Sequence, residues 1–246
     1  MIWLEETAST NSYLKEHIGD IAPFEIVAAR NQTAGRGQRG NSWETEPGKN
    51  LTFSFHFSPE NILPREQFVI SEAIALAMTG VLNRYGIEAR VKWPNDIYVD
   101  DRKICGILIE NSIMGTRIAD SIIGAGLNVN QEIFLSDAPN PVSMRQLTGV
   151  DYDLDEVGEI VGENIRKYFE YLKLAGDRDE LDRLYHASLW RNDGSAYPFV
   201  DTASGEGFEA RIRRVEPTGH LVLDVQRDGE TAERRVYAFK EVGFVL

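Results

Sequence analysis

Two arginines stand in a glycine-rich stretch of the sequence, residues 31–43, where they could hold an anion. The hexapeptide at 35–40 reads GRGQRG and has the spacing GxGxxG that is typical of dinucleotide-binding loops. A dinucleotide site requires a helix that begins inside the motif, whereas Pro47 and Gly48 follow closely here and a strand-like run comes next. We therefore interpret the stretch as a loop in which Arg36, Arg39 and glycine backbone N–H groups receive carboxylate or phosphate oxygens. For this loop taken alone, a solvated turn is the alternative.

A single lysine close to a glycine marks a second stretch, residues 91–110. Lys103 begins a strand-like run and precedes Gly106, where a ligand can come close to the backbone. Upstream, Asn95 and Asp96 follow a Trp-Pro pair and carry oxygen atoms that suit Mg²⁺ or a ribose. Taken alone, Lys103 could equally be an ordinary surface lysine. The Trp-Pro pair could equally be the packed end of a strand.

Hydropathy patterns predict the elements that position these motifs. Apolar or alternating runs of strand type cover 25–30, 51–57, 89–93, 97–99, 104–110 and 118–129. The run 51–57 alternates so cleanly that we expect a half-buried strand. Apolar residues at helical spacing predict helices over 65–85, 153–173 and 179–188. Asp153 with Glu156 is typical of a capping box at the start of the second of these helices.

The composition changes after residue 190. Turn-forming residues there separate short strand-type runs at 208–215, 220–226 and 234–239. Short strands of this kind predict a small β-barrel. We therefore expect two domains, 1–190 and 191–246.

Composition excludes several classes of protein. The chain has 246 residues, of which 42% are hydrophobic and 26% charged, as is ordinary for a globular protein. Its net charge of −13 gives no general attraction to nucleic acid or to an anionic membrane. Cys105 is the one cysteine, so neither an intramolecular disulfide nor a multi-cysteine metal site can form. The N-terminus has acidic residues where a signal peptide carries a basic segment, and we expect a cytoplasmic protein.

Five short motifs occur together in a fixed order along the first 130 residues. They are STN at 9–11, QTAGRGQRG at 32–40, KWPND at 92–96, KICGIL at 103–108 and GAGLNVN at 124–130. In order and spacing the chain resembles bacterial biotin protein ligases, in the short form without an N-terminal DNA-binding domain. The resemblance implies an α+β fold of the class II synthetase-like biotin–lipoate ligase type. Such a fold has a mixed, mostly antiparallel β-sheet with helices packed on it and a small C-terminal SH3-like β-barrel.

The resemblance also implies a reaction. It is ATP-dependent biotinylation of a specific lysine on a biotin carboxyl carrier protein or domain, through biotinyl-5′-AMP. ATP and Mg²⁺ are the implied cofactors, biotin is the substrate, and we expect neither DNA nor a membrane as partner. Two alternatives stay open: a lipoate or octanoate protein ligase or transferase, and a non-catalytic biotin-binding or interaction protein.

Residue roles follow from the same resemblance. The implied catalytic residues are Lys103, Arg36 and Arg39. Biotin would be bound by Ser9, Thr10, Asn11, Gln32, Gly35, Arg36, Gly37, Gln38, Lys103 and Gly106. ATP and the adenylate would be bound by Arg36, Arg39, Trp43, Asn95, Asp96, Lys103 and Asn128.

No protein metal site is assigned, and we expect Mg²⁺ to arrive with ATP near Asp96. A second loop, 131–145, which includes Phe134 and the segment 139–143, would order over the nucleotide. Many relatives carry a third arginine where this chain has Gln38. That departure leaves open whether Arg36 or Arg39 makes the main phosphate contact.

Overall fold

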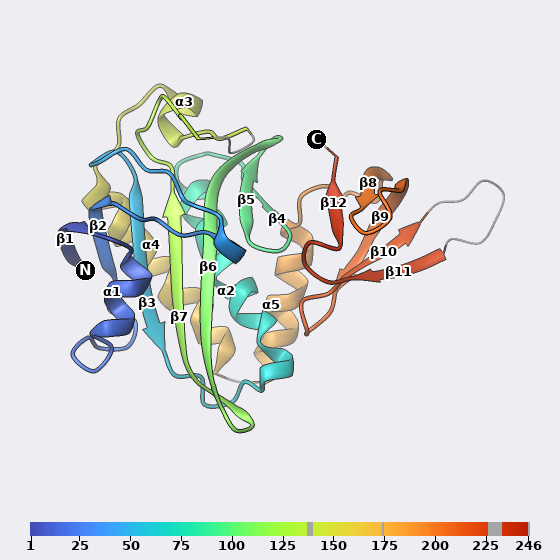
Figure 1. The fold of residues 1–246 in the computed structure, drawn as a ribbon, viewed down its shortest axis with the longest axis horizontal. Coiled ribbons are helices and arrows are strands. Elements are labelled where there is room, and N and C mark those ends of the chain that lie inside the picture. Colours follow the sequence, from blue (N-terminus) through green and yellow to red (C-terminus); the bar gives the residue numbers. More distant parts are fainter. Residues whose placement is uncertain (137–139, 174, 226–232, 246) are drawn as a thin grey trace.

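Seven strands form one sheet in the order β1-β2-β3-β7-β6-β5-β4 (Figure 1). They are β1 (Ile2–Thr7), β2 (Val27–Gln32), β3 (Leu51–Phe57), β4 (Arg90–Lys92), β5 (Asp96–Val99), β6 (Arg102–Met114) and β7 (Arg117–Leu127). β1 and β2 run parallel, and the other neighbouring pairs are antiparallel. This computed structural model describes residues 1–136, 140–173, 175–225 and 233–245, without the side chains of residues 39, 175 and 176. The sheet confirms the predicted mixed, mostly antiparallel α+β fold.

Helices lie on both faces of this sheet. They are α1 (Thr10–Glu16), α2 (Phe68–Arg84), α3 (Met144–Thr148), α4 (Leu154–Phe169) and α5 (Ala175–Ser188), with 3-10 turns at Gln38–Gly40, Pro64–Glu66 and Glu170–Leu172. α2 packs against α4, α5 and strands β4 to β6 (Figure 1). On the other face, Leu14 of α1 packs with Val27, whereas the next residue, Ala28, belongs to the main core. Successive strand residues point to opposite faces, so the two clusters lie on opposite sides of the sheet.

Strand β3 is buried at every position, which corrects the expectation of a half-buried strand. Phe53 and Phe55 belong to the main core, and the polar residues Thr52, Ser54 and His56 are buried as well. The polar side chains are hydrogen-bonded: Thr52 Oγ1 donates to the Ala29 carbonyl at 3.2 Å, and His56 Nε2 lies 2.9 Å from the Ile21 carbonyl. The face of β3 that carries Thr52, Ser54 and His56 is therefore covered by a second layer, although polar residues of these types are usually exposed.

The long helices agree with the predicted ranges, but their ends differ in detail. α2 (Phe68–Arg84) follows the turn Pro64–Glu66, and α4 with its following turn fills 154–172. Asp153 caps α4 by accepting hydrogen bonds from the Asp155 and Glu156 N–H groups. The reciprocal capping box is found instead at α3, between Ser143 and Gln146. In the described ranges no helix combines the length and apolarity that crossing a bilayer demands.

The C-terminal part forms a second sheet of five antiparallel strands, in the order β11-β10-β9-β8-β12. They are β8 (Tyr197–Asp201), β9 (Gly207–Val215), β10 (Leu221–Val225), β11 (Glu233–Tyr237) and β12 (Val242–Phe244). This sheet is consistent with an SH3-like fold and confirms the predicted strands at β9 to β11. Position 226, the predicted end of one run, lies outside the described residues. The domain boundary after residue 190 stays a prediction.

Candidate active site

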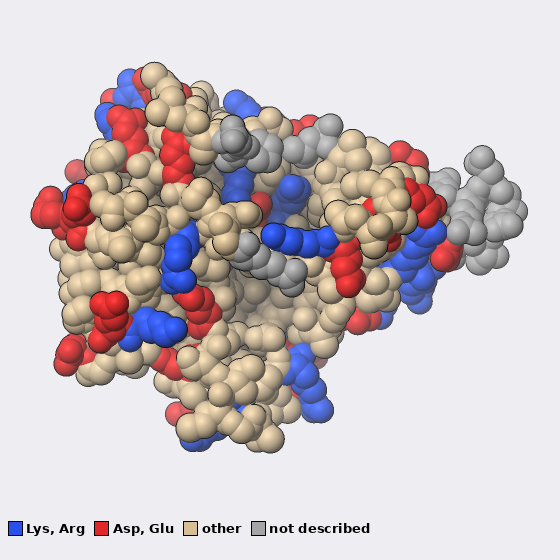
Figure 2. All heavy atoms as spheres, viewed as in Figure 1, with Lys and Arg blue, Asp and Glu red and all other residues tan. Residues whose placement is uncertain are grey.

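A cavity of about 1020 Å³ opens between the two sheets. Its wall is built by the glycine-rich loop, by β4 to β7 and by Phe239, Lys240 and Phe244 of the C-terminal part. Figure 2 shows it as a hollow in the surface with Lys and Arg side chains around it. In an acidic chain, local positive charge of this kind favours an anionic ligand. The volume is at the upper end of the roughly 300–1,000 Å³ of an ordinary ligand pocket, which leaves room for two small ligands.

The cavity brings together most of the residues for which a role is predicted. Those in its wall are Ser9, Thr10, Asn11, Gln32, Arg36, Gly37, Gln38, Trp43, Asn95, Asp96, Lys103, Gly106 and Asn128. Gly35 is not in the described wall; its carbonyl accepts a hydrogen bond from the Trp43 N–H at 2.9 Å. The backbone of Arg39 lies in the turn Gln38–Gly40, and its side chain lies outside the described atoms.

One end of the cavity is polar and buried. Thr10 and Asn11 open α1 and are only 4% and 3% exposed. Gln32 Oε1 accepts hydrogen bonds from Thr10 N at 2.8 Å and Thr10 Oγ1 at 3.2 Å. Asn11 Nδ2 donates to Glu110 Oε2 at 2.8 Å, and Ser54 Oγ donates to Asn11 Oδ1 at 2.6 Å. Fixed donors and acceptors in a buried position suit a small polar head group.

Two glycines form a floor on which an indole ring lies. Gly106 of β6 and Gly126 of β7 are partners across the sheet, and a Cβ atom on either would collide with Trp43. Glycine is required there because the indole lies across the bare backbone. Trp43 Nε1 and Asn128 Oδ1 are buried without a hydrogen-bond partner in the described structure. This part of the cavity therefore has a donor and an acceptor to offer a ligand.

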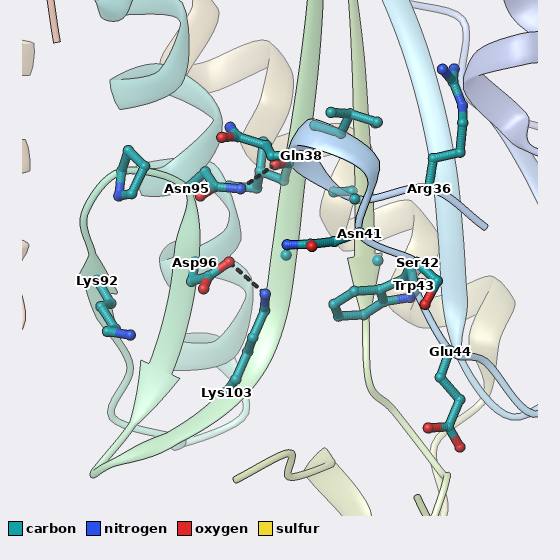
Figure 3. Close-up of a pocket in the computed structure, with 18 of the residues that line it drawn as sticks. Arg36, Gln38, Asn41, Ser42, Trp43, Glu44, Lys92, Asn95, Asp96 and Lys103 are labelled. Atoms are coloured by element: carbon teal, nitrogen blue, oxygen red, sulfur yellow. Dashed lines mark hydrogen bonds and ion pairs between the residues drawn. The ribbon is translucent and has the colours of Figure 1, made fainter. Parts of the chain in front are cut away.

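Lys103 and Asp96 form an ion pair in the cavity wall, with Nζ 2.7 Å from Oδ1 (Figure 3). Both side chains are mostly buried, at 25% and 20% exposure, and stand on the neighbouring strands β6 and β5. Lys103 Nζ also lies 5.4 Å from the centre of the Trp43 ring. The Lys103 N–H donates to the Asn140 carbonyl at 2.8 Å, and the Lys103 carbonyl accepts from the Val142 N–H at 2.9 Å. A cation, an indole and the second loop therefore meet at one place.

Arg36 is bound to a carboxylate and is turned away from Lys103. Its guanidinium group donates to both oxygens of Glu110, at 2.8 Å and 3.3 Å. Figure 3 shows Arg36 pointing away from the ion pair of Lys103 and Asp96. Because the Arg36 side chain is 43% exposed and that of Glu110 is 32% exposed, the pair contributes little to stability. Arg36 can therefore exchange Glu110 for another anion at small cost.

Two predicted ligand-binding amides hold the backbone. Asn95 Nδ2 donates to the Ile107 carbonyl at 2.7 Å, and Asn128 Nδ2 donates to the Val142 carbonyl at 3.1 Å. These contacts fix the ends of β5 and β7 at the cavity wall and leave the Asn128 Oδ1 atom without a partner. Contacts of either amide with a nucleotide stay predictions.

Glu44 ties the glycine-rich loop to the second loop, and the sequence pattern does not predict it. Its carboxylate accepts hydrogen bonds from the N–H groups of Leu135 at 2.8 Å and Ser136 at 2.7 Å, and from Gln131 Nε2 at 3.1 Å. Burial raises the pKa of Glu44, but these hydrogen bonds outweigh it and leave the pKa below its usual value. An acid beside Trp43 gives no local signal of such a distant contact. Phe134 of the second loop lines the cavity, and Pro139 lies outside the described residues.

Comparison with known proteins places this fold and this site in one family. The family model described as "Biotin/lipoate A/B protein ligase family" matches residues 3–128, about half of the chain. The bifunctional ligase/repressor BirA of Escherichia coli (strain K12) is 32% identical over 178 residues, which are 71% of this chain and 55% of BirA. The biotin–[acetyl-CoA-carboxylase] ligase of Paracoccus denitrificans is 30% identical over 165 residues, which are 62% of this chain and 66% of that protein.

A solved structure agrees with the fold along nearly the whole chain. The biotin protein ligase from Aquifex aeolicus in complex with biotin and ATP has a TM-score of 0.75 at 24% identity, and the match covers 98% of this chain and 97% of that one. The chain spans 55% and 38% of the BirA proteins of Escherichia coli and Salmonella typhimurium. The match over residues 3–128 includes the first four motifs and most of the fifth, and the chain belongs to the biotin/lipoate A/B protein ligase family.

Proposed function

We propose that this chain is a biotin ligase, which joins biotin to ATP as biotinyl-5′-AMP and passes the biotinyl group to a lysine of a biotin carboxyl carrier domain. One observation carries the proposal: a single cavity combines the buried groups of Thr10 and Asn11, the ammonium group of Lys103 and the indole of Trp43. The first suits the ureido ring of biotin. The second suits a carboxylate and the α-phosphate, and the third suits an adenine.

The names of similar proteins support biotin rather than lipoate as the acid. The Paracoccus denitrificans relative is named a biotin ligase, and the Aquifex aeolicus structure is described with biotin and ATP. Biotin and ATP are named for those proteins, and we assign them to this chain by analogy of fold and motif. The family itself includes lipoate enzymes, so the acid must be tested directly.

The first step brings two anions together. An oxygen of the biotin carboxylate attacks the α-phosphorus of ATP, the bond from that phosphorus to the bridging oxygen breaks, and pyrophosphate leaves with the electron pair. The ammonium group of Lys103 offsets the repulsion between carboxylate and phosphate and stabilises the charge that develops. Before the anions arrive, Asp96 holds this ammonium group in place. Arg36, once released from Glu110, adds a second cation near the same oxygens.

The nucleotide base has a suitable place on the indole. The Trp43 Nε1–H donor and the Asn128 Oδ1 acceptor are buried without partners in the described structure. A buried polar group without a partner costs about 1–3 kcal/mol, so a base whose amino group donates to Asn128 Oδ1 recovers that cost at this atom. The Nε1–H donor lies in the plane of the indole and is not used by a base stacked on the ring face. The ring face adds stacking energy of about 1–3 kcal/mol. Both features suit adenine.

The second step requires a dry site. The amine of the carrier lysine attacks the carbonyl carbon of biotinyl-5′-AMP, the bond to the phosphate oxygen breaks, AMP leaves and the amine loses a proton. Water would compete with the amine for the mixed anhydride. The second loop, held by Glu44 and by the Lys103 backbone, lies where it can exclude that water.

Magnesium fits this site as part of the nucleotide substrate. Among the described residues, no group of three His, Cys, Asp or Glu side chains lies close enough to hold a metal ion. Glu44 and Asp96 are the acids in the described wall; Glu44 binds the second loop, and Asp96 binds Lys103. We therefore propose that Mg–ATP enters as a complex whose metal is held mainly by phosphate oxygens.

Incubation with biotin, Mg–ATP and a purified carrier domain tests the proposal. We expect intact mass spectrometry to show one biotinyl group on the carrier, and pyrophosphate release to depend on biotin. Parallel reactions with lipoate and octanoate distinguish the lipoate alternative. Biotin binding without pyrophosphate release identifies the non-catalytic alternative, and modification of the carrier by lipoate alone refutes biotin ligation.

We further propose a cytoplasmic reaction without DNA as a partner. The single thiol, Cys105, is fully buried, and its pKa is raised by burial, so it behaves as a small core residue and suits a reducing compartment. The net charge of −13 opposes binding to operator DNA. A specific, salt-sensitive shift of operator DNA in a gel would refute the second statement.

A further inference from the structure

We propose that Lys92 is a second phosphate-binding cation in this cavity, placed to receive the β- and γ-phosphates of ATP and to stabilise pyrophosphate as it leaves. The inference rests on the proposed function and deepens it. Lys92 ends β4 directly opposite Asp96 of β5, and it lines the same cavity as Lys103. Figure 3 shows Lys92 on the side of Asp96 that faces away from Lys103.

Lys92 differs from Lys103 in what surrounds its charge. Within the part of the chain that the structure describes, no carboxylate lies within ion-pair distance of Lys92, whereas Asp96 lies 2.7 Å from the Lys103 ammonium. Lys92 Nζ donates a hydrogen bond to Tyr98 Oη at 3.1 Å. The ring centres of Tyr98, Trp190 and Phe244 lie 4.6, 5.8 and 5.4 Å from it.

Aromatic faces and one hydroxyl replace only part of the hydration that the ammonium group loses. Burial accordingly lowers the pKa of Lys92, and the nearby Asp96 carboxylate opposes that change, while Lys103 and Arg191 add to it. The cavity wall therefore contains a cation that gains from the arrival of an anion. Two other cations of the same wall, Lys103 and Arg36, instead have to give up a carboxylate first.

The order of groups along the wall suggests which anion arrives. In Figure 3, Trp43, Lys103, Asp96 and Lys92 follow one another across the cavity. Lys103 stands 5.4 Å from the Trp43 ring, whereas Lys92 stands against Phe244 of the second sheet. A nucleotide with its base on the indole and its α-phosphate at Lys103 extends its outer phosphates toward Lys92.

The chemistry gives Lys92 a role in one half-reaction only. When the bond between the α-phosphorus and the bridging oxygen breaks, negative charge accumulates on the departing pyrophosphate. A cation held there stabilises the transition state more than the ground state and speeds adenylation. No pyrophosphate is present when the carrier lysine attacks biotinyl-5′-AMP, so transfer does not use Lys92.

The test compares the two half-reactions in variants at position 92. Lys92→Met keeps an unbranched side chain without the charge, and Lys92→Arg restores the charge. Lys167→Met is the matched control, because Lys167 also lies beside an aromatic ring, 4.9 Å from that of Tyr168, but outside the described cavity wall. Biotin-dependent pyrophosphate release at varied ATP reports adenylation. Transfer from purified biotinyl-5′-AMP to the carrier reports the second step.

We expect Lys92→Met to lower kcat/KM for ATP in adenylation roughly 10- to 100-fold, the loss typical of a charged hydrogen bond. Transfer should stay within about twofold of the wild type. Lys92→Arg should recover most of the adenylation rate, and Lys167→Met should behave as the wild type in both reactions. Unaltered thermal melting of the variants would show that the fold is kept.

Two results overturn the inference about Lys92. One is adenylation by Lys92→Met within about twofold of the wild type, and the other is an equal loss in both half-reactions. If Lys92→Met does not fold, the lysine ammonium signals of the wild type are followed by NMR while pyrophosphate is added. A Lys92 signal that does not shift would also overturn the inference. A wild-type chain that forms no biotinyl-5′-AMP instead refutes the proposed function and is recognised before any variant is made.

Discussion

Replacement of Gly126 by alanine is predicted to weaken ATP binding by displacing Trp43. The indole lies across Gly106 and Gly126, which are partners on β6 and β7. A Cβ atom at position 126 would stand 2.3 Å from Trp43 Nε1, whereas ordinary contacts begin at 3.4 Å, so the two atoms must separate by about 1.1 Å. β7 is hydrogen-bonded to β3 and β6 on its two sides, so the ring moves and the strand does not.

The expected effect on ATP follows from the stacking energy. A base stacked on an aromatic side chain gains about 1–3 kcal/mol, so loss of the ring's position should raise the Kd for ATP roughly 5- to 150-fold. The effect on folding is smaller. Overpacking costs about 1–3 kcal/mol, but the colliding ring stands on a loop, and replacement of glycine returns about 0.4–1 kcal/mol through the unfolded chain.

A double-mutant cycle isolates the contact. Gly126→Ala and Trp43→Ala are each made alone and together, and the Kd for ATP is measured by calorimetry in the presence of biotin. In the Trp43→Ala background the new methyl group meets no indole, so we expect Gly126→Ala to have no further effect there. Gly19→Ala is the control, because a Cβ atom at position 19 has nothing within 4 Å and the backbone needs no glycine.

Additive losses in this cycle would refute the reasoning. They would mean that the methyl group collides with the nucleotide itself, and that the indole is not the surface on which the base rests. An unchanged Kd in Gly126→Ala would refute it as well, since the ring would then bind ATP equally well from a displaced position.

Three further predictions concern single acids and cations. Lys103→Ala should slow biotin-dependent pyrophosphate release roughly 100- to 1,000-fold, and a loss below about tenfold would remove Lys103 from the chemistry. Burial, with Asp182 adding to it, raises the pKa of Glu72 from 4.5 to about 8, so the free energy of unfolding falls as pH rises between these values. In urea unfolding, Glu72→Gln should therefore be more stable than the wild type by roughly 3–5 kcal/mol at pH 8 and similar to it near pH 4.5. Equal stabilities at pH 8 would contradict this prediction. Glu44→Ala should speed amide hydrogen exchange at residues 135–136 roughly tenfold or more, because it removes the acceptor of both N–H groups. The control Glu46→Ala should leave this exchange unchanged. Equal exchange rates in the two variants would show that Glu44 does not hold the loop.

Long, regular segments of the sequence predicted their elements well. α2 and α4 repeat an apolar pattern over several turns, and β6 and β7 are long strands with many apolar residues. β1 and α1 escaped prediction because each is short, and the exposed Glu5 and Glu6 interrupt the apolar pattern of β1. β8 and β12 were missed for similar reasons, since Pro198 stands inside the first and the second has three residues.

The motifs predicted which residues meet, but the pattern alone left their chemistry open. Only the joint order of five motifs placed the glycine-rich loop beside Lys103, and residues of both line one cavity in the structure. Their roles stay predictions. The partners that these side chains have without a ligand could not be predicted. Glu110 and Glu44 look like ordinary surface acids in the sequence, and their contacts depend on how distant strands and loops pack. A pattern of local periodicity carries no information about such pairs.

The resting contacts of the cations determine which ligand the cavity selects. Arg36 is held by Glu110 and Lys103 by Asp96, so an incoming anion exchanges one ion pair for another at either position. An exchange of this kind yields little net free energy, because the carboxylate that is set free must be hydrated or paired again. Lys92 has no ion-pair carboxylate to release among the described residues, and its buried charge is compensated by aromatic rings, a hydroxyl and the more distant Asp96 carboxylate. A ligand that reaches Lys92 therefore gains more than one that stops at Lys103. AMP and inorganic phosphate, which cannot span both lysines, should bind weakly, and ATP should owe its selection to Lys92 even though Lys103 stands closer to the bond that forms.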